Sequence, residues 1–396
     1  MAFSENLSRR KFLSGTGGAL ALAPMALNRL ELPLPASMAV AQSGTIITRK
    51  LGKTGIEIPI VSMGVMNADN PAVLQESYKL GIRFFDTARA YQQGRNEEMV
   101  GKVIKDLNVR NQVFVQTKAR LPQGMVIKSS TPEQRKQGIL DELNKSLTAL
   151  QMDYVDIFLL HSPSFDEISD SGIKEALEEM KKQKKARFVG VSHHQGQADV
   201  LNAIVKEGVY DAATVAFNFT MAQDTALLTA IKNAVKAGVG VIAMKSQATG
   251  RGQTDNVNQT AALKWVLNHE EITTAIPGYT NFDHMKEDFS VASGLNYTDT
   301  EKAFLSEKNL MASVQFCQQC STCRLTCPNR VDIPTLMRTH MYAAKYGNFV
   351  HARATLDEIS TDDGLRNCAD CSECKAKCAN YVNIADNIRD LKAMYL

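Results

Sequence analysis

The eight cysteines of this chain form the clearest chemical pattern in the sequence. All of them lie between Cys317 and Cys378, and none occurs in the first 316 residues. They form two runs with the spacing C-x2-C-x2-C-x3-C, and the second run begins 51 residues after the first. The members are Cys317, Cys320, Cys323 and Cys327 in the first run, and Cys368, Cys371, Cys374 and Cys378 in the second. Such local clustering indicates a metal site rather than disulfides distributed through a fold.

This spacing is typical of the thiolate ligands of 4Fe-4S clusters, which take four cysteines each, so two clusters would use all eight. In two-cluster ferredoxins the fourth cysteine of each run binds the other cluster. We therefore expect Cys327 to join the second set and Cys378 the first. Zinc is the alternative, because thiolate quartets also suit a tetrahedral ion. The third closely spaced cysteine and the Pro328 that follows the first run favour iron and sulfur.

A second group of polar residues lies upstream, where short apolar runs of the sequence end. Because these runs predict parallel strands, their carboxyl ends are expected to meet at one mouth, where the active sites of barrels lie. Taken singly, each of these residues has an alternative to a catalytic role: it could be an ordinary polar strand end, and Asp86 and Lys118 could form a buried ion pair. The residues are Asp86, Lys118, His161, Ser192, His193, Asn218 and Lys245.

The elements that position these residues extend from residue 45 to about 295, where short apolar runs alternate with segments of helical periodicity. Eight such units in about 250 residues are typical of a TIM barrel. A doubly wound sheet usually has a glycine-rich dinucleotide loop after its first strand, and residues 61–65 are not such a loop. The predicted strands span 58–65, 82–86, 113–118, 154–161, 187–193, 213–219, 239–245 and 272–277.

The barrel segment resembles the aldo-keto reductase family. The sequence FDTARAY at 85–91, followed by Gly94 and two glutamates, is similar to the signature of that family. Two further family motifs are similar to TK at 117–118 and LLHS at 159–162. The hairpin that closes the barrel floor in this family is similar to RKLGKTG at 49–55. The resemblance covers about 49–290.

This resemblance implies a (β/α)8 barrel whose Tyr91 donates a proton to a substrate carbonyl. It also implies that Asp86 and Lys118 tune Tyr91 and that His161 orients the carbonyl. A phenol has an ordinary pKa near ~10, and a neighbouring ammonium is expected to lower it.

The cofactor side departs from the family pattern. Where the family has Ser-Asn after the fifth strand, Ser192 is followed by His193, and Met244 stands at the position of the aromatic that stacks on the nicotinamide. Residues 276–279 and His284 occupy positions where many members carry basic residues for the 2'-phosphate of NADP. Losing two charge-assisted hydrogen bonds to that phosphate, worth roughly 1.5–3 kcal/mol each, would weaken NADP binding about 100-fold to 10,000-fold. We therefore expect NADP(H) or NAD(H), if either binds, to bind weakly. We assign the remaining nicotinamide site to Ser192, His193, Asn218, Lys245, Gly278 and Tyr279.

The N-terminal segment 1–41 resembles a twin-arginine export signal. Arg9 and Arg10 precede an uncharged stretch of 17 residues, which is short and weakly hydrophobic for a bilayer span. The sequence AVA at 39–41 is a small-x-small cleavage site. We expect a cleaved signal, the twin-arginine translocase as a partner, and a periplasmic or otherwise exported protein. A retained N-terminal anchor is the alternative.

The whole chain divides into a signal over 1–41, a barrel over 45–295, a linker helix over 296–316 and an iron-sulfur module over 317–396. Helices predicted over 333–346 and 349–359 make this module similar to an α-helical ferredoxin. The composition, 44% hydrophobic and 22% charged with a net charge of +3, is that of a soluble globular protein and indicates no nucleic-acid partner.

Two functions from different classes are compatible with these features. The first is an exported oxidoreductase that interconverts a small carbonyl and an alcohol, with Tyr91 as acid and base and two 4Fe-4S clusters relaying electrons to or from a redox partner protein. The second is an electron-transfer or partner-docking protein whose barrel is a scaffold that no longer binds nicotinamide. Purely structural clusters are a third interpretation.

Overall fold

The computed structural model describes residues 44–248, 257–369, 371 and 373–396. The expected export signal and its cleavage site lie outside the described residues. Within the described part of the chain, no helix has both the length and the apolar character needed to span a membrane.

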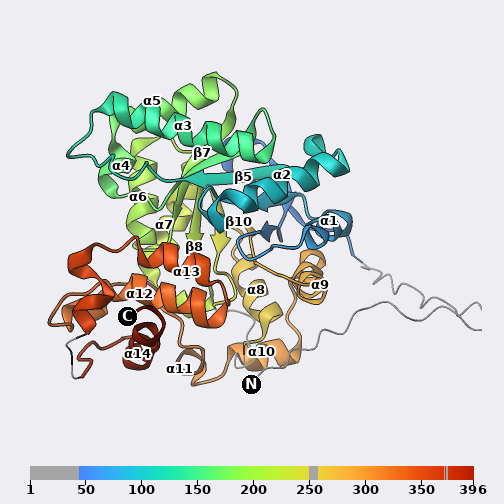
Figure 1. The fold of residues 1–396 in the computed structure, drawn as a ribbon. Helices are drawn as coiled ribbons and strands as arrows, with labels where there is room; N and C mark the ends of the chain where they lie inside the picture. Colours follow the sequence, from blue (N-terminus) through green and yellow to red (C-terminus); the bar gives the residue numbers. More distant parts are fainter. Residues whose placement is uncertain (1–43, 249–256, 370, 372) are drawn as a thin grey trace, which may run out of the picture. The chain divides into compact units, whose positions relative to one another are not determined.

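Eight parallel strands form the centre of the molecule (Figure 1). Each strand pairs with the next one along the chain, and a bridge between Val61 and Ala275 joins the two ends of the sheet. The backbone N–H of Ala275 donates to the carbonyl of Ile60 at 2.9 Å, and that of Gly64 to the carbonyl of Pro277 at 3.0 Å. The barrel predicted from the sequence is thereby confirmed, and the alternative interpretation, a doubly wound open sheet, is wrong. The strands are β3 (Met63–Gly64), β4 (Phe84–Asp86), β5 (Phe114–Ala119), β6 (Val155–His161), β7 (Ala186–His193), β8 (Ala212–Ala216), β9 (Gly240–Met244) and β10 (Ile272–Ala275).

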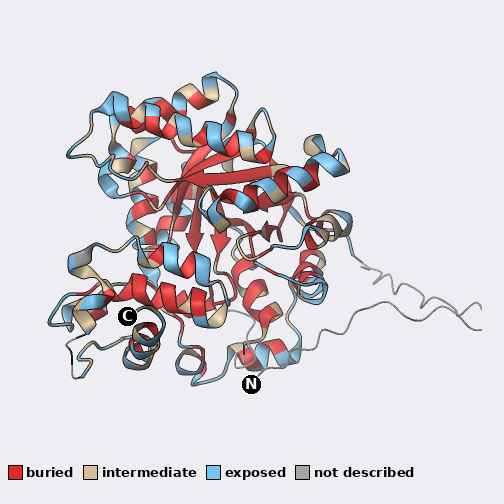
Figure 2. Ribbon diagram, viewed as in Figure 1, coloured by how far each residue is buried: buried red, intermediate tan, exposed pale blue. Residues whose placement is uncertain are grey.

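The strands are buried on both faces, which explains why their sequences are continuous apolar runs. Every residue of β6, β8 and β9 is buried, and Figure 2 shows the burial concentrated on the barrel and on the inner sides of the helices. Parallel strands covered by helices lack a solvated face, so they do not alternate between polar and apolar residues.

Helices connect successive strands and cover the outside of the barrel. Their starts carry the expected signals: Thr131 forms a capping box with Gln134 at the start of α3, and Asp170 caps α5. The connecting helices are α1 (Pro71–Leu80), α2 (Arg95–Leu107), α3 (Pro132–Leu150), α4 (Phe165–Ser169), α5 (Ser171–Lys182), α6 (Gln197–Glu207), α7 (Thr225–Lys236), α8 (Gln259–Leu267) and α9 (Phe282–Ser290).

A hairpin covers the amino end of β9, as the family resemblance implies. Strands β1 (Thr48–Lys50) and β2 (Glu57–Pro59) pair in antiparallel fashion. Between them, Gly52 adopts a φ of +50°, and a Cβ there would collide with the carbonyl oxygen of Gly238. Glycine is therefore required where the hairpin meets the barrel.

Residues 296–316 form two short helices, α10 (Asp299–Leu305) and α11 (Leu310–Val314), rather than the single linker helix expected. The break follows Leu305, where the hydroxyl of Ser306 donates to the carbonyl of Ala303 at 2.9 Å and so competes with helix continuation.

The C-terminal module is helical and has a small apolar core of its own. It contains α12 (Ile333–His340), a π-helical turn over Met341–Lys345, α13 (Phe349–Leu356) and α14 (Ile384–Tyr395), drawn in orange to dark red in Figure 1. The helix predicted over 333–346 thus contains a π-helical segment, a feature frequent at functional sites. The apolar core of the module includes Val331, Ile333, Leu336, Val382, Ile384, Ile388 and Leu391.

Candidate active site

The four residues of the expected catalytic tetrad lie together at the carboxyl end of the barrel. Asp86 ends β4, Lys118 lies near the end of β5 and His161 ends β6, while Tyr91 begins the short helix that follows β4. All four are buried, with Tyr91 only 7% and His161 only 5% exposed. Because parallel strands end at the same edge, residues far apart in the chain meet there: Tyr91 and His161, 70 positions apart, lie with their ring centroids 6.1 Å from each other.

Lys118 and Asp86 form a buried ion pair. The Nζ of Lys118 lies 2.6 and 2.7 Å from the two carboxylate oxygens of Asp86 and 2.8 Å from the carbonyl oxygen of Thr87. These contacts use all three N–H groups of the ammonium. Burial lowers the pKa of Lys118, and the neighbouring Asp86 carboxylate raises it in opposition.

Tyr91 packs against both the ammonium and the histidine. The Nζ of Lys118 lies 4.9 Å from the centre of its ring, and the ring of His161 meets it edge-on at 6.1 Å between centroids. Burial raises the pKa of Tyr91 well above its ordinary value, the Asp86 carboxylate raises it further, and Arg120 lowers it. The net direction is opposite to the lowering expected from Lys118, because burial dominates and the Asp86 carboxylate adds to it. Tyr91 is therefore a neutral phenol at rest.

His161 is a neutral imidazole with one unpartnered nitrogen. Burial, and to a lesser extent Arg120 and Lys118, lower its pKa well below the ordinary value. Its Nδ1 is buried and has no hydrogen-bond partner among the described residues. Buried polar atoms usually have a partner, so a free ring nitrogen beside Tyr91 can bind a group that enters the site.

A pocket with a cavity volume of about 170 Å³ opens beside Tyr91 and is called the tyrosine pocket here. Asp86 and Tyr91 line it on one side. Of the six residues expected to bind nicotinamide, Lys245, Gly278 and Tyr279 also line it, together with Met244. The pocket therefore contains both part of the tetrad and half of the expected cofactor residues.

Ser192, His193 and Asn218 do not line the tyrosine pocket. The imidazole of His193 packs beside the loop after β6, with its Nε2 3.1 Å from the carbonyl oxygen of Pro163. Asn218 has a structural role, since its carboxamide caps the turn at Thr220 and donates to the carbonyl of Lys245 at 3.1 Å. The neighbouring His194, in the bend that follows the end of β7, lines the pocket in place of His193. The sequence contains two consecutive histidines here, His193 and His194, and does not indicate which of them points into the pocket.

Lys245 brings a half-buried amino group to the tyrosine pocket. It follows β9 with a left-handed φ of 54°, and the hydrogen bond from Asn218 holds its carbonyl. Its Nζ lies 4.5 Å from the ring centre of Tyr342 and 5.1 Å from that of Tyr346, both in the C-terminal module. Burial lowers the pKa of Lys245 to about 7, with a smaller contribution from Arg338. Sequence reasoning missed the two tyrosines, since nothing in the cysteine pattern indicates that this module lines the barrel mouth.

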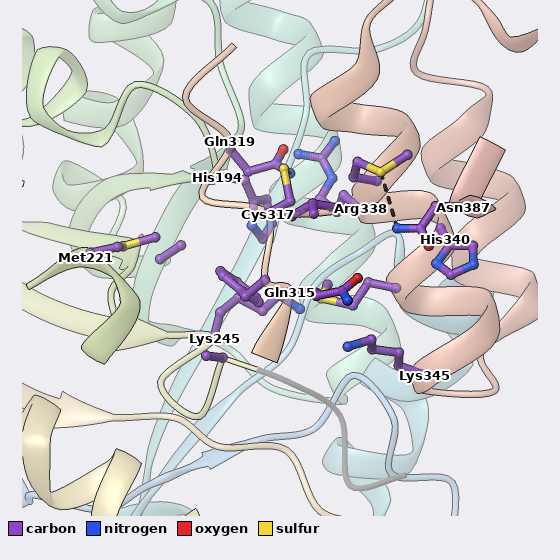
Figure 3. A pocket seen from close by; sticks show the side chains of 16 residues that line it. His194, Met221, Lys245, Gln315, Cys317, Gln319, Arg338, His340, Lys345 and Asn387 are labelled. Atoms are coloured by element: carbon purple, nitrogen blue, oxygen red, sulfur yellow. Dashed lines mark hydrogen bonds between the residues drawn. The ribbon is translucent and has the colours of Figure 1, made fainter. Parts of the chain in front are cut away.

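A second pocket connects this region with the cysteines and is called the cysteine pocket here. Its lining includes Cys317, and it shares His194, Lys245 and Lys345 with the tyrosine pocket (Figure 3). The side-chain amide of Gln319 donates to the Sγ of Cys317 at 3.2 Å. The first cysteine run therefore begins beside the barrel mouth.

The cysteines form two groups that agree with the exchange of the fourth residue. Burial raises the pKa of the Cys317 thiol to about 12, with smaller contributions from the nearby thiols of Cys323, Cys378 and Cys320. Burial likewise raises the pKa of Cys368 to about 11. The nearby thiols of Cys327, Cys371 and Cys374 raise it further, and Lys392 lowers it. Cys378 thus neighbours the first run and Cys327 the second.

This donor set fits two iron-sulfur clusters. All eight cysteines are free thiols, and the backbone N–H of Asn380 donates to the Sγ of Cys378 at 3.3 Å. Within the described ranges, no group of three or more His, Cys, Asp or Glu residues is placed to hold a single metal ion. A 4Fe-4S cluster binds its four thiolates through separate irons, so its ligands lie farther apart than those of one ion.

Comparison with known proteins supports this division of the chain. Residues 64–260 match the aldo/keto reductase family, and residues 316–383 match a 4Fe-4S dicluster domain. The uncharacterized oxidoreductase YqkF of Bacillus subtilis is 36% identical over 151 residues, which cover 36% of this chain and 48% of that protein, about half its length. The L-galactose dehydrogenase of Arabidopsis thaliana is 27% identical over 304 residues, covering 65% of this chain and 92% of that protein.

Solved structures share the barrel. The aldo-keto reductase AKR11C1 from Bacillus halodurans superposes with a TM-score of 0.55 at 22% identity, covering 66% of this chain and 95% of that chain. A Klebsiella pneumoniae aldo/keto reductase in complex with NADP and acetate superposes with a TM-score of 0.53 at 20% identity, covering 66% of this chain and 94% of that chain. At these identities the likeness shows the fold. The chain therefore combines an aldo/keto reductase domain with a C-terminal 4Fe-4S dicluster domain, which is the domain composition of an oxidoreductase.

Proposed function

We propose that the protein interconverts a small carbonyl compound and the corresponding alcohol, with Tyr91 as the acid and base. The observation that carries this proposal is the packing of Tyr91 between Lys118 and His161 at the edge of the tyrosine pocket. A buried phenol, a fixed ammonium and an unpartnered imidazole at one barrel mouth suit proton transfer to a carbonyl oxygen.

In the reducing direction, the neutral phenol of Tyr91 holds the proton that the carbonyl oxygen receives. The Nδ1 or Nε2 of His161 donates a hydrogen bond to the same oxygen and orients it. The ammonium of Lys118, fixed by Asp86 and Thr87, stabilises the negative charge that develops on Tyr91 as its proton leaves. Burial of all four side chains keeps water from the reacting atoms and strengthens these interactions.

A nicotinamide dinucleotide, when bound, would supply or accept the hydride. The Klebsiella pneumoniae structure of similar fold contains NADP, and in this chain Lys245, Gly278 and Tyr279 line the tyrosine pocket. The ammonium of Lys245 suits a phosphate, and Met244 provides an apolar surface but no aromatic stacking. We expect weak binding of NADP(H) or NAD(H), to be measured by calorimetric titration of anaerobically purified protein with NADPH and with NADH.

The two clusters would exchange single electrons with a redox partner protein when bound. The position of Cys317 supports this part of the proposal, because its pocket shares His194 and Lys245 with the tyrosine pocket. Electron paramagnetic resonance of the anaerobic protein after addition of an alcohol substrate tests it. Oxidation of one alcohol releases two electrons, one for each cluster, and two protons, of which Tyr91 would accept the hydroxyl proton. A cluster signal that appears with substrate in wild type and is absent in Tyr91→Phe is the expected result.

The second candidate function is a docking or electron-transfer protein with a catalytically inactive barrel. It is favoured by Met244 in place of the stacking aromatic and by the positions of Ser192 and Asn218 outside the pocket. Turnover of a panel of aldehydes, ketones and alcohols distinguishes the two functions, because a scaffold consumes none of them.

Tyr91→Phe tests the proposed chemistry directly. The variant is expected to lose at least roughly a hundredfold in kcat, which is typical for the removal of a general acid. Tyr210→Phe is the matched control, since the hydroxyl of this buried tyrosine donates to the carbonyl of Ile168 at 2.7 Å, outside the tyrosine pocket. Undiminished turnover by Tyr91→Phe would refute the role of Tyr91.

We also propose that residues 1–41 direct export to the periplasm by the twin-arginine translocase. The paired Arg9 and Arg10 before an uncharged stretch support this proposal. Replacing both arginines with lysine is expected to retain the protein in the cytoplasm. N-terminal sequencing of the exported protein tests cleavage, and a Met1 start would contradict it.

A further inference from the structure

Helix α13 of the C-terminal module is fixed to the barrel at both ends. Before its start, the side-chain amide of Asn348 donates to the Oδ1 of Asn67 at 2.9 Å, in the loop after β3. Beyond its end, the carboxylate of Glu358 lies 2.7 Å from Arg120, which follows β5, and 2.7 Å from Arg338 on α12. A helix held at two points has little freedom to move relative to the barrel, so its inward side chains have defined positions.

One inward side chain of α13, that of His351, contacts Tyr91. Its ring meets the ring of Tyr91 edge-on, with 5.4 Å between centroids and an angle of 88°. On its other side it packs on Tyr342 at 4.5 Å between centroids. His351 is only 7% exposed, and the carboxamide of Asn348 accepts a hydrogen bond from its backbone N–H at 3.0 Å. Burial lowers the pKa of His351 to about 3, so the imidazole is neutral.

One ring nitrogen of His351 has no structural partner among the described residues. Its Nδ1 is buried and has no hydrogen-bond partner in the described part of the chain, as is also true of the Nδ1 of His161. Two neutral imidazoles, one from each domain, therefore meet Tyr91 edge-on with a free ring nitrogen each. In the proposed reaction His161 serves the reacting oxygen, which leaves the nitrogens of His351 for a second polar atom close to the first.

We propose that His351 is a substrate-contacting residue supplied by the iron-sulfur module, and that it binds an oxygen on the carbon next to the reacting carbonyl or alcohol. The substrate class is then that of compounds with vicinal oxygens, such as α-hydroxy carbonyls. This inference rests on the proposed function. It means that the active site is assembled from both domains and is complete only when α13 is docked.

A pair of small substrates that differ in one hydroxyl tests this proposal. The kcat and KM of the cluster-replete protein are measured for the reduction of hydroxyacetone and of acetone, with NADPH in excess as the reductant. His351→Phe, which keeps a ring against Tyr91 but removes both nitrogens, is expected to lower kcat/KM for hydroxyacetone roughly ten- to a hundredfold, the range for an unpaired buried hydrogen-bonding group. With acetone the change is expected to stay below about threefold.

Two further variants separate substrate contact from folding. His351→Asn keeps a polar group and is expected to recover part of the preference for hydroxyacetone. Thr355→Val is the matched control, because Thr355 is buried on the same helix and its hydroxyl bonds the helix backbone at His351. Iron content and melting temperature are measured for every variant and are expected to match those of Thr355→Val.

The outcomes distinguish this inference from the proposed function. If Tyr91→Phe is inactive but His351→Phe affects both substrates equally, or neither, His351 does not contact the second oxygen and the inference is overturned. If wild type turns over no carbonyl or alcohol, or if Tyr91→Phe remains active, the proposed function is wrong and the inference that rests on it is also overturned.

Discussion

Replacing Asp86 with asparagine is expected to move the alkaline limit of turnover to lower pH. Asp86 accepts two short contacts from the ammonium of Lys118, at 2.6 and 2.7 Å, in a site where both side chains are buried. Its carboxylate raises the pKa of Lys118 against the lowering effect of burial, and it also raises the pKa of Tyr91. The asparagine side chain carries no charge, so both pKa values are expected to fall in Asp86→Asn.

The size of the shift follows from the contacts that are lost. Asparagine keeps one acceptor oxygen, so one charge-assisted hydrogen bond of roughly 1.5–3 kcal/mol is removed. At about 1.36 kcal/mol for each pKa unit, this loss corresponds to a shift of about 1 to 2 pH units. The protonated forms of Lys118 and Tyr91 are the active ones in the reducing direction. A lower pKa removes them at lower pH, so kcat/KM falls earlier as pH rises.

The assay is the pH dependence of kcat/KM for carbonyl reduction, in wild type and Asp86→Asn. Asp170→Asn is the control, because Asp170 also pairs with a buried cation, Arg135, at 2.6 Å with 8% and 5% of the two side chains exposed. That pair does not line the tyrosine pocket. The control is expected to lower the melting temperature without moving the pH profile. An unmoved alkaline limit in Asp86→Asn, with a similar loss of stability, would refute the coupling of this ion pair to Tyr91.

Three further predictions concern the cofactor residues and the interface between the domains. Because burial lowers the pKa of Lys245 to about 7, its charge is present below that pH and lost above it, so NADPH affinity measured calorimetrically should fall about tenfold from pH 6 to pH 8. Lys245→Met should remove this pH dependence, and an unchanged dependence would contradict a phosphate contact. Cys378→Ala should perturb the same paramagnetic signal as Cys317→Ala; loss of different signals would contradict the exchanged fourth cysteine. Glu358→Gln, which loses contacts with two arginines, should raise amide hydrogen exchange in α13 roughly fivefold, and unchanged exchange would show that these ion pairs do not hold the helix.

The barrel and its mouth could be predicted from the sequence because their signals are local. Apolar runs followed by helical periodicity repeat eight times, and a parallel strand places its last residues at the same edge wherever it stands in the barrel. Asp86, Lys118 and His161 therefore had to lie near one another once the fold was known. The cysteine spacing likewise indicates its metal chemistry without any tertiary information, because the ligands of each run are close along the chain.

The electrostatics of the tetrad could not be predicted in the same way. The charge pattern led to the expectation that Lys118 lowers the pKa of Tyr91, whereas burial and Asp86 raise it. How much water surrounds a phenol, and whether a carboxylate already balances the ammonium, depend on packing. The choice between His193 and His194 has the same origin, since the side-chain direction depends on where β7 ends.

By itself, the sequence of this protein determined the strand-helix repeat, the positions of the polar strand ends and the two cysteine runs. Each of these is a pattern of residue types at short spacing, and secondary structure and metal ligation respond directly to such patterns. Only the tertiary structure placed His351, Tyr342 and Tyr346 at Tyr91 and Lys245. These residues are about 100 or more positions from their partners, and no local pattern records a contact made when one domain docks on another.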